Sequence, residues 1–294
     1  DALPILALGS NTGCSVIISQ LFGAKETARM KTAVSTSVIA ILALSALLTT
    51  GGFLFCEPLM RLLGTPENVF ADSQLYLNVY IGGLTFLFLY NICTGVFTAL
   101  GDSRTPLLII GVATVVNTVL DLWFVAGLGM GTAGAALATT AAQAVSFGMA
   151  LVLVARRTGL LQPKLSFFRM HGALLRLILR LGIPSALQMT IAGFSWLVVT
   201  FLVNQYGVNV SAGNGVAIKT KDICQLFISA MASGATTMIA QNLGASKFER
   251  AKDVMYTAMK ITCAMAAAMI VLVELFAPQR AAVFTNEAGV RDAA

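Results

Sequence analysis

Charged residues and catalytic residue sets are what this sequence has least of. Asp, Glu, Lys and Arg make up 11% of the 294 residues, whereas soluble domains carry about 25%. His171 is the single histidine and lies in a basic connection, where we interpret it as a surface residue. The sequence has no Ser/His/Asp, Cys/His or HExxH arrangement, so most hydrolytic sites lack their residues. We therefore expect that the chain is not an enzyme.

Cysteine pairs and nucleotide-binding loops are missing as well. The GLGMG run at 127–131 does not lie between a strand and a helix, so no dinucleotide site is expected there. The cysteines are scattered without a CxxC pair, which is typical of small hydrophobic residues in a core and predicts neither disulfides nor a metal centre. They are Cys14, Cys56, Cys93, Cys224 and Cys263. We expect no cofactor.

Hydrophobic residues, in contrast, are abundant and occur in long blocks. They form 57% of the chain, and the mean hydropathy is +0.84. A helix needs roughly 20 apolar residues to cross a bilayer. Eight blocks are near or above this length: 1–22, 33–55, 75–100, 105–126, 131–154, 176–203, 213–241 and 251–277. The sequence therefore predicts an all-α, polytopic membrane protein in contact with a lipid bilayer.

The net charge of +6 follows a membrane topology rather than a nucleic-acid surface. If alternate connections face the cytoplasm, 13 of the 19 Lys and Arg residues lie on that side. Such an excess fits the positive-inside rule and sets the orientation. We expect a multi-pass protein of a bacterial or archaeal plasma membrane and no nucleic-acid partner. The inner residues are Lys25, Arg29, Lys31, Arg104, Arg156, Arg157, Lys164, Arg169, Arg176, Arg180, Lys247, Arg250 and Lys252.

Two segments of the sequence recur. SQLFGAKETARMK, which starts at Ser19, returns as AQNLGASKFERAK at an offset of 221 residues. EPLMRLLGTPENV, which starts at Glu57, resembles APQRAAVFTNEAGV at an offset of 220 residues. Two matches in nearly the same register indicate an internal repeat. Six predicted spans lie between the copies of the first segment, so both copies would have the same orientation, as in a parallel repeat.

The repeat predicts two bundles of six helices, eight of which would lie in this chain. Residues 1–154 would hold five of the six helices of an N-terminal lobe, whose first helix would precede Asp1. Residues 155–175 would form the cytoplasmic linker between the lobes, and 176–294 the first three helices of a C-terminal lobe. On this count we expect a fragment that lacks about one N-terminal and three C-terminal helices.

One acid lies inside a predicted span. Asp121 follows Asn117 by four residues, so both lie on one helical face. A carboxylate in a spanning helix costs roughly 2.5–3.5 kcal/mol, and its default interpretation is an ion or proton site. Thr139, Thr140 and Gln143 of the next span would add hydroxyl and amide oxygens, which suit Na⁺. The alternative is that Asp121 caps or pairs with a neighbouring helix at the outer interface.

Several of these motifs resemble one transporter family. ALGDSRTPLLI, NTVLDL and MGTAGAALATTAAQ resemble the fourth-to-sixth helix region of the multidrug and toxic compound extrusion (MATE) family. GIPSALQ and ISAMASGATTMIAQNLGASKFERAK resemble its seventh and eighth helices, and the match covers essentially the whole chain. The resemblance implies a cation-coupled antiporter that exports amphipathic, often cationic compounds by alternating access of two six-helix lobes. It also implies a monomer when intact.

The resemblance is to the DinF-like branch, whose cation site uses an Asp on the first helix, an Asn and an Asp on the fifth and a Thr on the sixth. Asn117, Asp121 and Thr139 occupy matching positions. Other members carry a Glu on the seventh helix, where this chain is apolar near Ala192. This departure favours coupling through the N-terminal lobe. The sequence leaves open whether the coupling ion is H⁺ or Na⁺.

The substrate cavity is predicted less sharply than the cation site. Gln143, Thr140 and Gln188 are the candidates, although Gln188 fits helix–helix hydrogen bonding equally well. A lipid or lipid-linked oligosaccharide flippase of related architecture is the alternative function. Such a flippase would need a cavity rich in basic residues for pyrophosphate, and the basic residues of this chain cluster in the inner loops instead.

Overall fold

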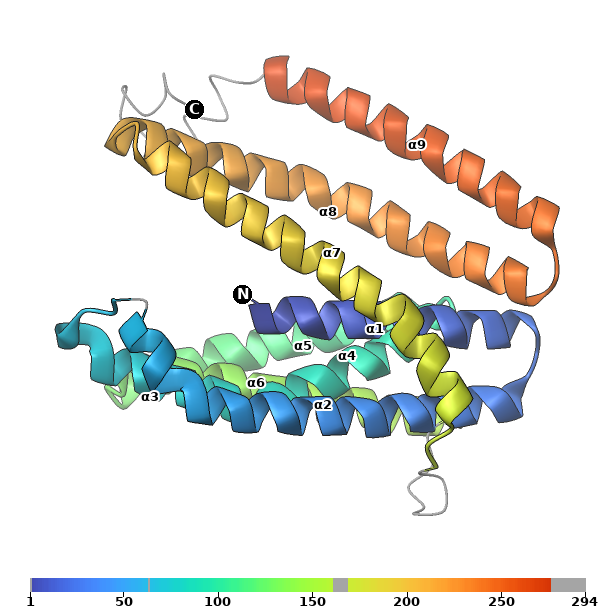
Figure 1. Cartoon of the computed structure of the whole chain (residues 1–294), viewed down its shortest axis with the longest axis horizontal. Helices are drawn as coiled ribbons and strands as arrows, with labels where there is room; N and C mark the ends of the chain where they lie inside the picture. The colour runs from blue at the N-terminus through green and yellow to red at the C-terminus, as the bar shows by residue number, and fades with distance from the viewer. Residues whose placement is uncertain (1, 63, 161–168, 276–294) are drawn as a thin grey trace. The chain divides into compact units, whose positions relative to one another are not determined.

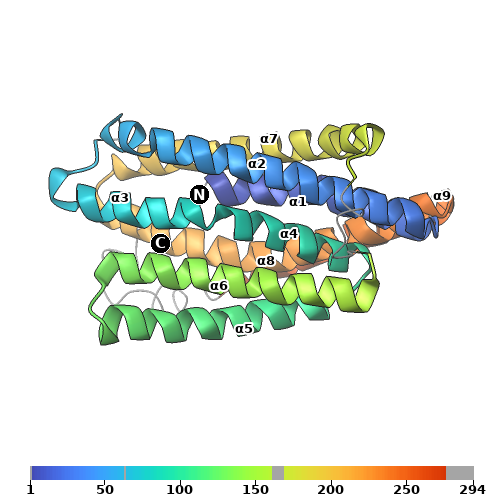
Figure 2. The ribbon, with the colours of Figure 1, turned by 90° about the horizontal axis from the view of Figure 1, so that it is seen from below.

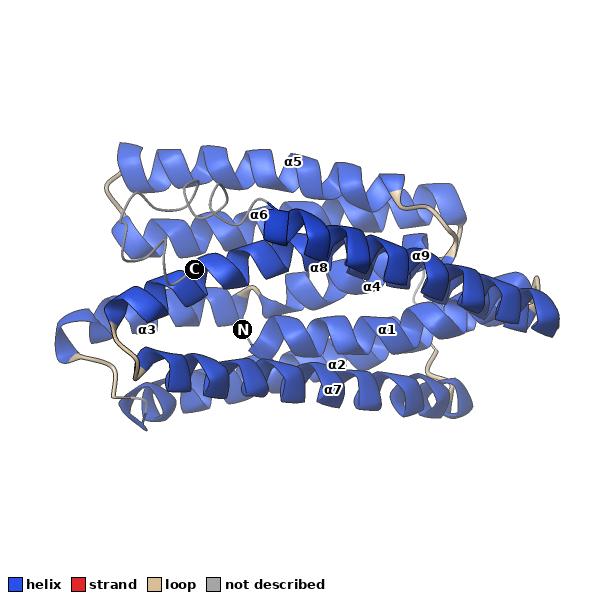
Figure 3. Cartoon of the chain, turned by 90° about the horizontal axis from the view of Figure 1, so that it is seen from above, coloured by secondary structure: helices blue, strands red, loops and turns tan. Residues whose placement is uncertain are grey.

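The computed structural model describes residues 2–62, 64–160 and 169–275, and these form helices and connections without a strand (Figure 3). The chain divides into two compact units, Asp1–Leu187 and Gln188–Ala294. The prediction of an all-α protein is therefore confirmed. The first unit contains the predicted lobe 1–154, the linker and the start of 176–294, so the division into these lobes stays a prediction.

Helices run through the described part of each of the eight predicted blocks. Six of the described helices are long and apolar enough to cross a membrane, and a bent pair would make a seventh. The first helix, of 22 residues, is outside this set, so the predicted number of eight spans is not confirmed. The elements are α1 (Ala2–Gly23), α2 (Thr27–Leu62), α3 (Glu67–Gly82), α4 (Leu84–Ala99), α5 (Arg104–Asp121), η1 (Leu122–Gly127), α6 (Gly131–Leu153), η2 (Val154–Thr158), α7 (Gly172–Asn204), α8 (Val208–Gly244) and α9 (Phe248–Leu275).

The predicted span 75–100 is not one straight helix. It is divided between α3 and α4, which meet at Gly83 with a bend of 42° (Figure 2). A Cβ atom at Gly83 would lie 2.8 Å from Cγ2 of Thr140 on α6. Only glycine therefore allows α6 to approach the chain this closely. The bend coincides with a helix contact that the hydrophobic pattern does not reveal.

α4 is the central helix of the first unit. It contacts α1, α2, α5 and α6, and nine of its 16 residues are buried. Phe88 and Phe97 are among the largest fully buried side chains. Cys93 of α4 and Cys14 of α1 are buried as predicted for small core residues, although Cys263 is exposed. This core fixes the positions of α5 and α6, which carry the candidate site.

Hydrogen bonds of a carboxylate and a hydroxyl group link the start of α5 to the segment after α6. Asp102 accepts hydrogen bonds from the amides of Arg104 and Thr105, at the first turn of α5, and from the Thr105 hydroxyl at 2.6 Å. Arg157, on η2 directly after α6, donates to that hydroxyl at 2.9 Å. Because these bonds join the start of α5 to η2, which follows α6, they hold the two helices together at this end.

The segment before α7 is fixed to α2 by two buried side chains. Ser35 accepts a hydrogen bond from the amide of Arg169 at 2.8 Å and donates to its carbonyl at 3.1 Å. Thr36 accepts from the amide of His171 at 3.1 Å. The His171 side chain is exposed, as predicted. Lys164 lies outside the described residues.

Small residues bring α1 and α7 into backbone contact. A Cβ atom at Gly13 would lie 2.5 Å from the carbonyl oxygen of Ile178 and 2.9 Å from the amide of Gly182. At Gly9 it would lie 2.6 Å from Ala186. Gly9 and Gly13 are one turn apart, as are Gly182 and Ala186, which is the small-xxx-small pattern of close packing in membranes. The first half of α7 therefore packs with the first unit.

In the second unit α8 and α9 pack as an antiparallel pair (Figure 1), and their turn repeats the turn between α1 and α2. Lys25 and Ser246, 221 positions apart, are the described non-glycine residues with positive φ, at 60° and 58°. The amide of Ala24 bonds to the carbonyl of Gln20, and that of Ala245 to Gln241. The recurring segment thus folds into the same turn twice. The other recurring segment cannot be compared in this way, because its second copy, at 277–290, lies outside the described residues.

Candidate cation and substrate site

Asp121 lies where α5 changes its helical geometry. α5 has 18 residues and ends at Asp121, and the next six residues, Leu122–Gly127, form the π-helix η1. π-Helical turns are rare and often mark functional sites, because the wider turn changes which way side chains and carbonyls point. The predicted span 105–126 is therefore helical throughout, with its acid at the junction of the two helix types.

A pocket lies beside this part of α5, between α4, α5 and α6. Its volume is about 250 Å³, below the roughly 300–1,000 Å³ of pockets for drug-sized ligands. A water molecule occupies about 30 Å³ in the liquid, so the pocket suits a hydrated ion or a small part of a substrate. The lining residues are Leu87, Tyr90, Ile110, Ala113, Thr114, Asn117, Thr139, Ala142, Gln143 and Ser146.

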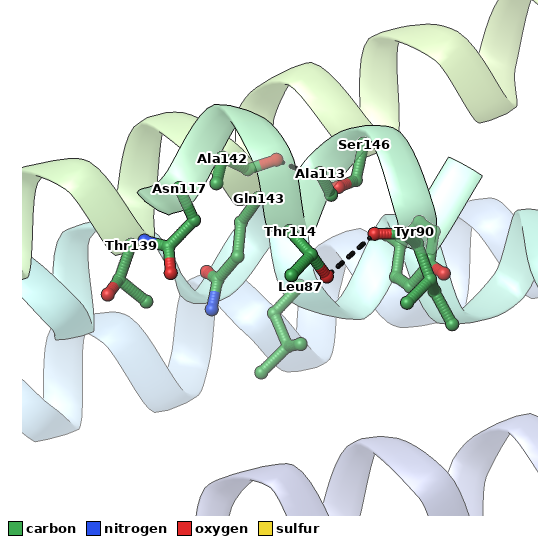
Figure 4. Close-up of a pocket in the computed structure, with 10 residues that line it drawn as sticks. Leu87, Tyr90, Ala113, Thr114, Asn117, Thr139, Ala142, Gln143 and Ser146 are labelled. Carbon is green, nitrogen blue, oxygen red and sulfur yellow. Dashed lines mark hydrogen bonds between the residues drawn. The ribbon is translucent and has the colours of Figure 1, made fainter. Parts of the chain in front are cut away.

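Three of the predicted site residues meet at this pocket. Asn117 projects from α5 beside Thr139 and Gln143 of α6 (Figure 4). This arrangement follows from the short connection between the two helices, which makes them antiparallel neighbours. Asp121 is not among the lining residues and lies one helical turn beyond Asn117.

Two other candidates lie elsewhere. Thr140 faces the bend at Gly83, and its hydroxyl donates to the carbonyl of Val79 at 3.4 Å. Its side chain therefore contributes to helix packing and does not line this pocket. Gln188 is exposed on α7 and belongs to the second unit.

The site contains polar atoms without a hydrogen-bond partner in the described residues. These are Oδ1 of Asp121, Nδ2 of Asn117 and the hydroxyl oxygen of Tyr90, all buried from solvent. Buried polar groups are almost always paired, and each exception needs an explanation. A cation or a proton would satisfy the Asp121 oxygen, whereas the Asn117 amide nitrogen is a donor and would need an acceptor, such as an oxygen atom of a substrate or of water.

The sequence interpretation missed Tyr90, Thr114 and Ser146. Thr114 donates to Ile110 at 2.9 Å and Ser146 to Ala142 at 2.8 Å, so their own helices satisfy the hydroxyl hydrogens (Figure 4). Their oxygen lone pairs stay available to the pocket. An aromatic or hydroxyl residue in an apolar run is usually a packing residue, and no sequence signal distinguished these three.

The donor set fits a hard cation or a proton. A carboxylate, an amide oxygen and hydroxyl oxygens at Asp121, Asn117 and Thr139 are the ligand types of Na⁺. Within the described ranges no group of three or more His, Cys, Asp or Glu residues could hold a metal ion. The chemistry available here is therefore that of one carboxylate among neutral oxygen donors.

Comparison with protein families matches residues 3–123 and 184–294 to the MatE family. The relatives include the "Probable multidrug resistance protein YoeA" of Bacillus subtilis, 30% identical over 287 residues, which cover 95% of this chain and 62% of YoeA. The "Probable multidrug resistance protein YpnP" of the same organism is 34% identical over 83% of this chain and 54% of its own length. The chain thus spans less than two thirds of the length of either relative.

Solved structures share the fold. A crystal structure of MATE in the bent conformation superposes with a TM-score of 0.88 at 23% identity, over 99% of this chain and 66% of that one. An outward-facing multidrug resistance MATE family transporter of the MOP superfamily has a TM-score of 0.85 at 25% identity, over 99% of this chain and 65% of that one.

Proposed function

Because the chain belongs to the MatE family, we propose that it acts in a membrane exporter of small amphipathic, often cationic organic compounds, driven by H⁺ or Na⁺. YoeA and YpnP are both named as multidrug resistance proteins, which supports this substrate class. In the proposal, residues 1–154 and 176–294 are parts of two lobes joined by 155–175, in a monomer of the plasma membrane. Alternating access of the lobes moves the substrate.

The observation that carries the proposal is the buried carboxylate oxygen of Asp121, which has no hydrogen-bond partner among the residues that the structure describes. A charged carboxylate within a spanning helix costs roughly 2.5–3.5 kcal/mol. Binding of a cation or a proton removes most of that cost. Asp121 is therefore stabilised by the coupling ion, and Asn117 and Thr139 contribute the neighbouring oxygen atoms.

Coupling follows from the position of these groups on two helices. Cation binding from the outside draws the donors of α5 and α6 together, whereas release lets them separate. This change in the helix pair favours the outward release of a substrate bound in the first bundle. One positive charge that moves inward through 100 mV supplies about 2.3 kcal/mol, which supports a substrate gradient of roughly fiftyfold.

Export of a fluorescent cationic dye from cells that express the protein tests this function. Asp121→Asn keeps the shape of the side chain and removes its charge, so we expect export to fall to the background of cells without the protein. Asp72→Asn is the matched control, because Asp72 is exposed on α3, and it should export like the wild type. Equal export by Asp121→Asn and the wild type, at equal membrane levels, would contradict the proposal.

A flippase for pyrophosphate-linked lipids is not favoured. The lining of the pocket contains no Lys or Arg residue, whereas a pyrophosphate group needs basic partners.

A further inference from the structure

The bend at Gly83 brings the end of α3 against the middle of α6. A Cβ atom at Gly83 would lie 2.8 Å from Cγ2 and 3.0 Å from Oγ1 of Thr140. The Thr140 hydroxyl donates to the carbonyl of Val79, in the last turn of α3, at 3.4 Å. Because Gly83 has no side chain, α6 lies directly against this turn, and a hydroxyl bond joins the two helices.

This contact places Tyr80 of α3 beside Gln143 of α6. Tyr80 directly follows Val79 on α3, and Gln143 lies three residues after Thr140 on α6. The Tyr80 hydroxyl and the Gln143 side chain form a hydrogen bond. The ring of Tyr80 is stacked on the ring of Tyr76, one turn earlier, with centroids 6.4 Å apart and 7° between the ring planes. The stack fixes the direction in which the Tyr80 hydroxyl points.

Gln143 also belongs to the pocket between α4, α5 and α6. It lines the pocket together with Asn117 and Thr139 (Figure 4). Its side-chain amide carries an oxygen acceptor on one side and an NH₂ donor on the other. A partner outside the pocket that binds one of these groups therefore decides which of them the pocket presents. The lining contains no charged residue, so neutral oxygen atoms are what it offers to a cation.

We propose that Tyr80 is a positioning residue for the binding of an exported organic cation. Tyr80 accepts a hydrogen bond from the amide nitrogen of Gln143, and the amide oxygen then faces the pocket and binds an N–H group of the cation. Tyr80 is not one of the lining residues, so it acts through Gln143. The inference rests on the proposed function for its ligand. The pocket volume of about 250 Å³ accommodates the amino or ammonium group of such a compound.

Ethidium, a fluorescent cation with two amino groups, is the probe, and fluorescence anisotropy of the purified full chain in detergent measures its binding. We expect Gln143→Leu and Tyr80→Phe each to weaken binding by about two- to tenfold, as for the loss of one hydrogen bond. Because Tyr80 acts through Gln143, the variant with both changes should bind no more weakly than Gln143→Leu alone. Tyr256→Phe, an exposed position on α9, is the matched control and should bind like the wild type.

Thermal unfolding of the same variants without ethidium tests the bond between the two side chains. We expect the losses from Tyr80→Phe and Gln143→Leu to be non-additive, because either change removes the same hydrogen bond. Additive losses would overturn the proposal, since the two side chains would then not be bonded.

Three binding results would also overturn it. Tyr80→Phe could bind ethidium as tightly as the wild type, or Gln143→Leu could do so. The variant with both changes could be weakened by the product of the two single effects, which would show that Tyr80 acts independently of Gln143. Each of these results leaves the proposed export function in place. A wild-type protein that does not bind ethidium would contradict the proposed substrate class itself, and this inference with it.

Discussion

Two carboxylates of the first unit have opposite surroundings. Asp102 accepts three hydrogen bonds at the start of α5, whereas Oδ1 of Asp121, at the end of the same helix, is buried and accepts none in the described residues. Asp102 is thereby a structural group with its partners in place. Asp121 is the group that still needs a partner, which is the reason why we assign the coupling ion to it.

Asp102 gives a prediction at the residue scale. The Thr105 hydroxyl, followed by the amides of Thr105 and Arg104 and the charge of Arg157, holds the pKa of the Asp102 carboxyl below its ordinary value. A lowered pKa in the folded state stabilises the fold above the ordinary value, about pH 4, and this contribution is lost as the pH falls through the lowered one.

We therefore expect Asp102→Ala to cost about 1 kcal/mol at pH 7, as for the loss of a helix N-cap. The difference from the wild type should shrink below about pH 4. Thermal unfolding in detergent at pH 3 and pH 7 measures it, with Asp72→Ala as the exposed control. A deficit of equal size at both pH values would contradict the assigned role of the carboxylate.

At the scale of helices, the sequence predicts some contacts and leaves others open. The pairing of α5 with α6 and the identical turns at Lys25 and Ser246 were predictable, because a short connection and a recurring segment determine local structure. The bend at Gly83 was not, because a glycine pair is also tolerated in a straight membrane helix. Thr139 and Thr140 point to different neighbours, and periodicity alone does not say which helix each one faces.

The contact between α1 and α7 depends on the absence of a side chain at Gly13. A methyl group there would meet the backbone of α7, which cannot move without displacing the whole helix. We expect Gly13→Ala to destabilise the chain by about 1–3 kcal/mol. Gly111→Ala on α5, where a Cβ atom meets nothing within 4 Å, should instead stabilise it by about 0.5–1 kcal/mol. Thermal unfolding shifts of the same sign for both variants would count against this packing.

The repeated turns predict a stabilising change. Lys25 and Ser246 have left-handed backbone conformations, which cost non-glycine residues roughly 1–2 kcal/mol. Glycine avoids this cost but loses more backbone entropy on folding, which offsets part of the gain. We therefore expect Ser246→Gly to stabilise the chain by about 0.5–1 kcal/mol. Ala245→Gly, at φ −78°, relieves no strain and should not stabilise it. A loss of stability in Ser246→Gly would mean that its side chain matters more than its backbone.

At the scale of the molecule, the central helix α4 of this member of the MatE family fixes the positions of the helices that carry the site. α4 contacts α1, α2, α5 and α6, so α5 and α6 are anchored on a common core. The start of α5 is joined through Thr105 to Arg157 on η2, which follows α6, while Asn117 of α5 and Thr139 of α6 meet further along the two helices. The two helices are therefore joined at one end, and in the proposed mechanism a cation bound between them changes their separation towards the other end.

The measurement that tests the coupling claim most directly is dye transport in proteoliposomes under an imposed gradient of H⁺ or of Na⁺. The account predicts that one of the two gradients drives transport by the wild-type protein and by Asp72→Asn, and that neither drives transport by Asp121→Asn. Gradient-driven transport by Asp121→Asn at the wild-type rate would show that the coupling ion does not bind at this carboxylate.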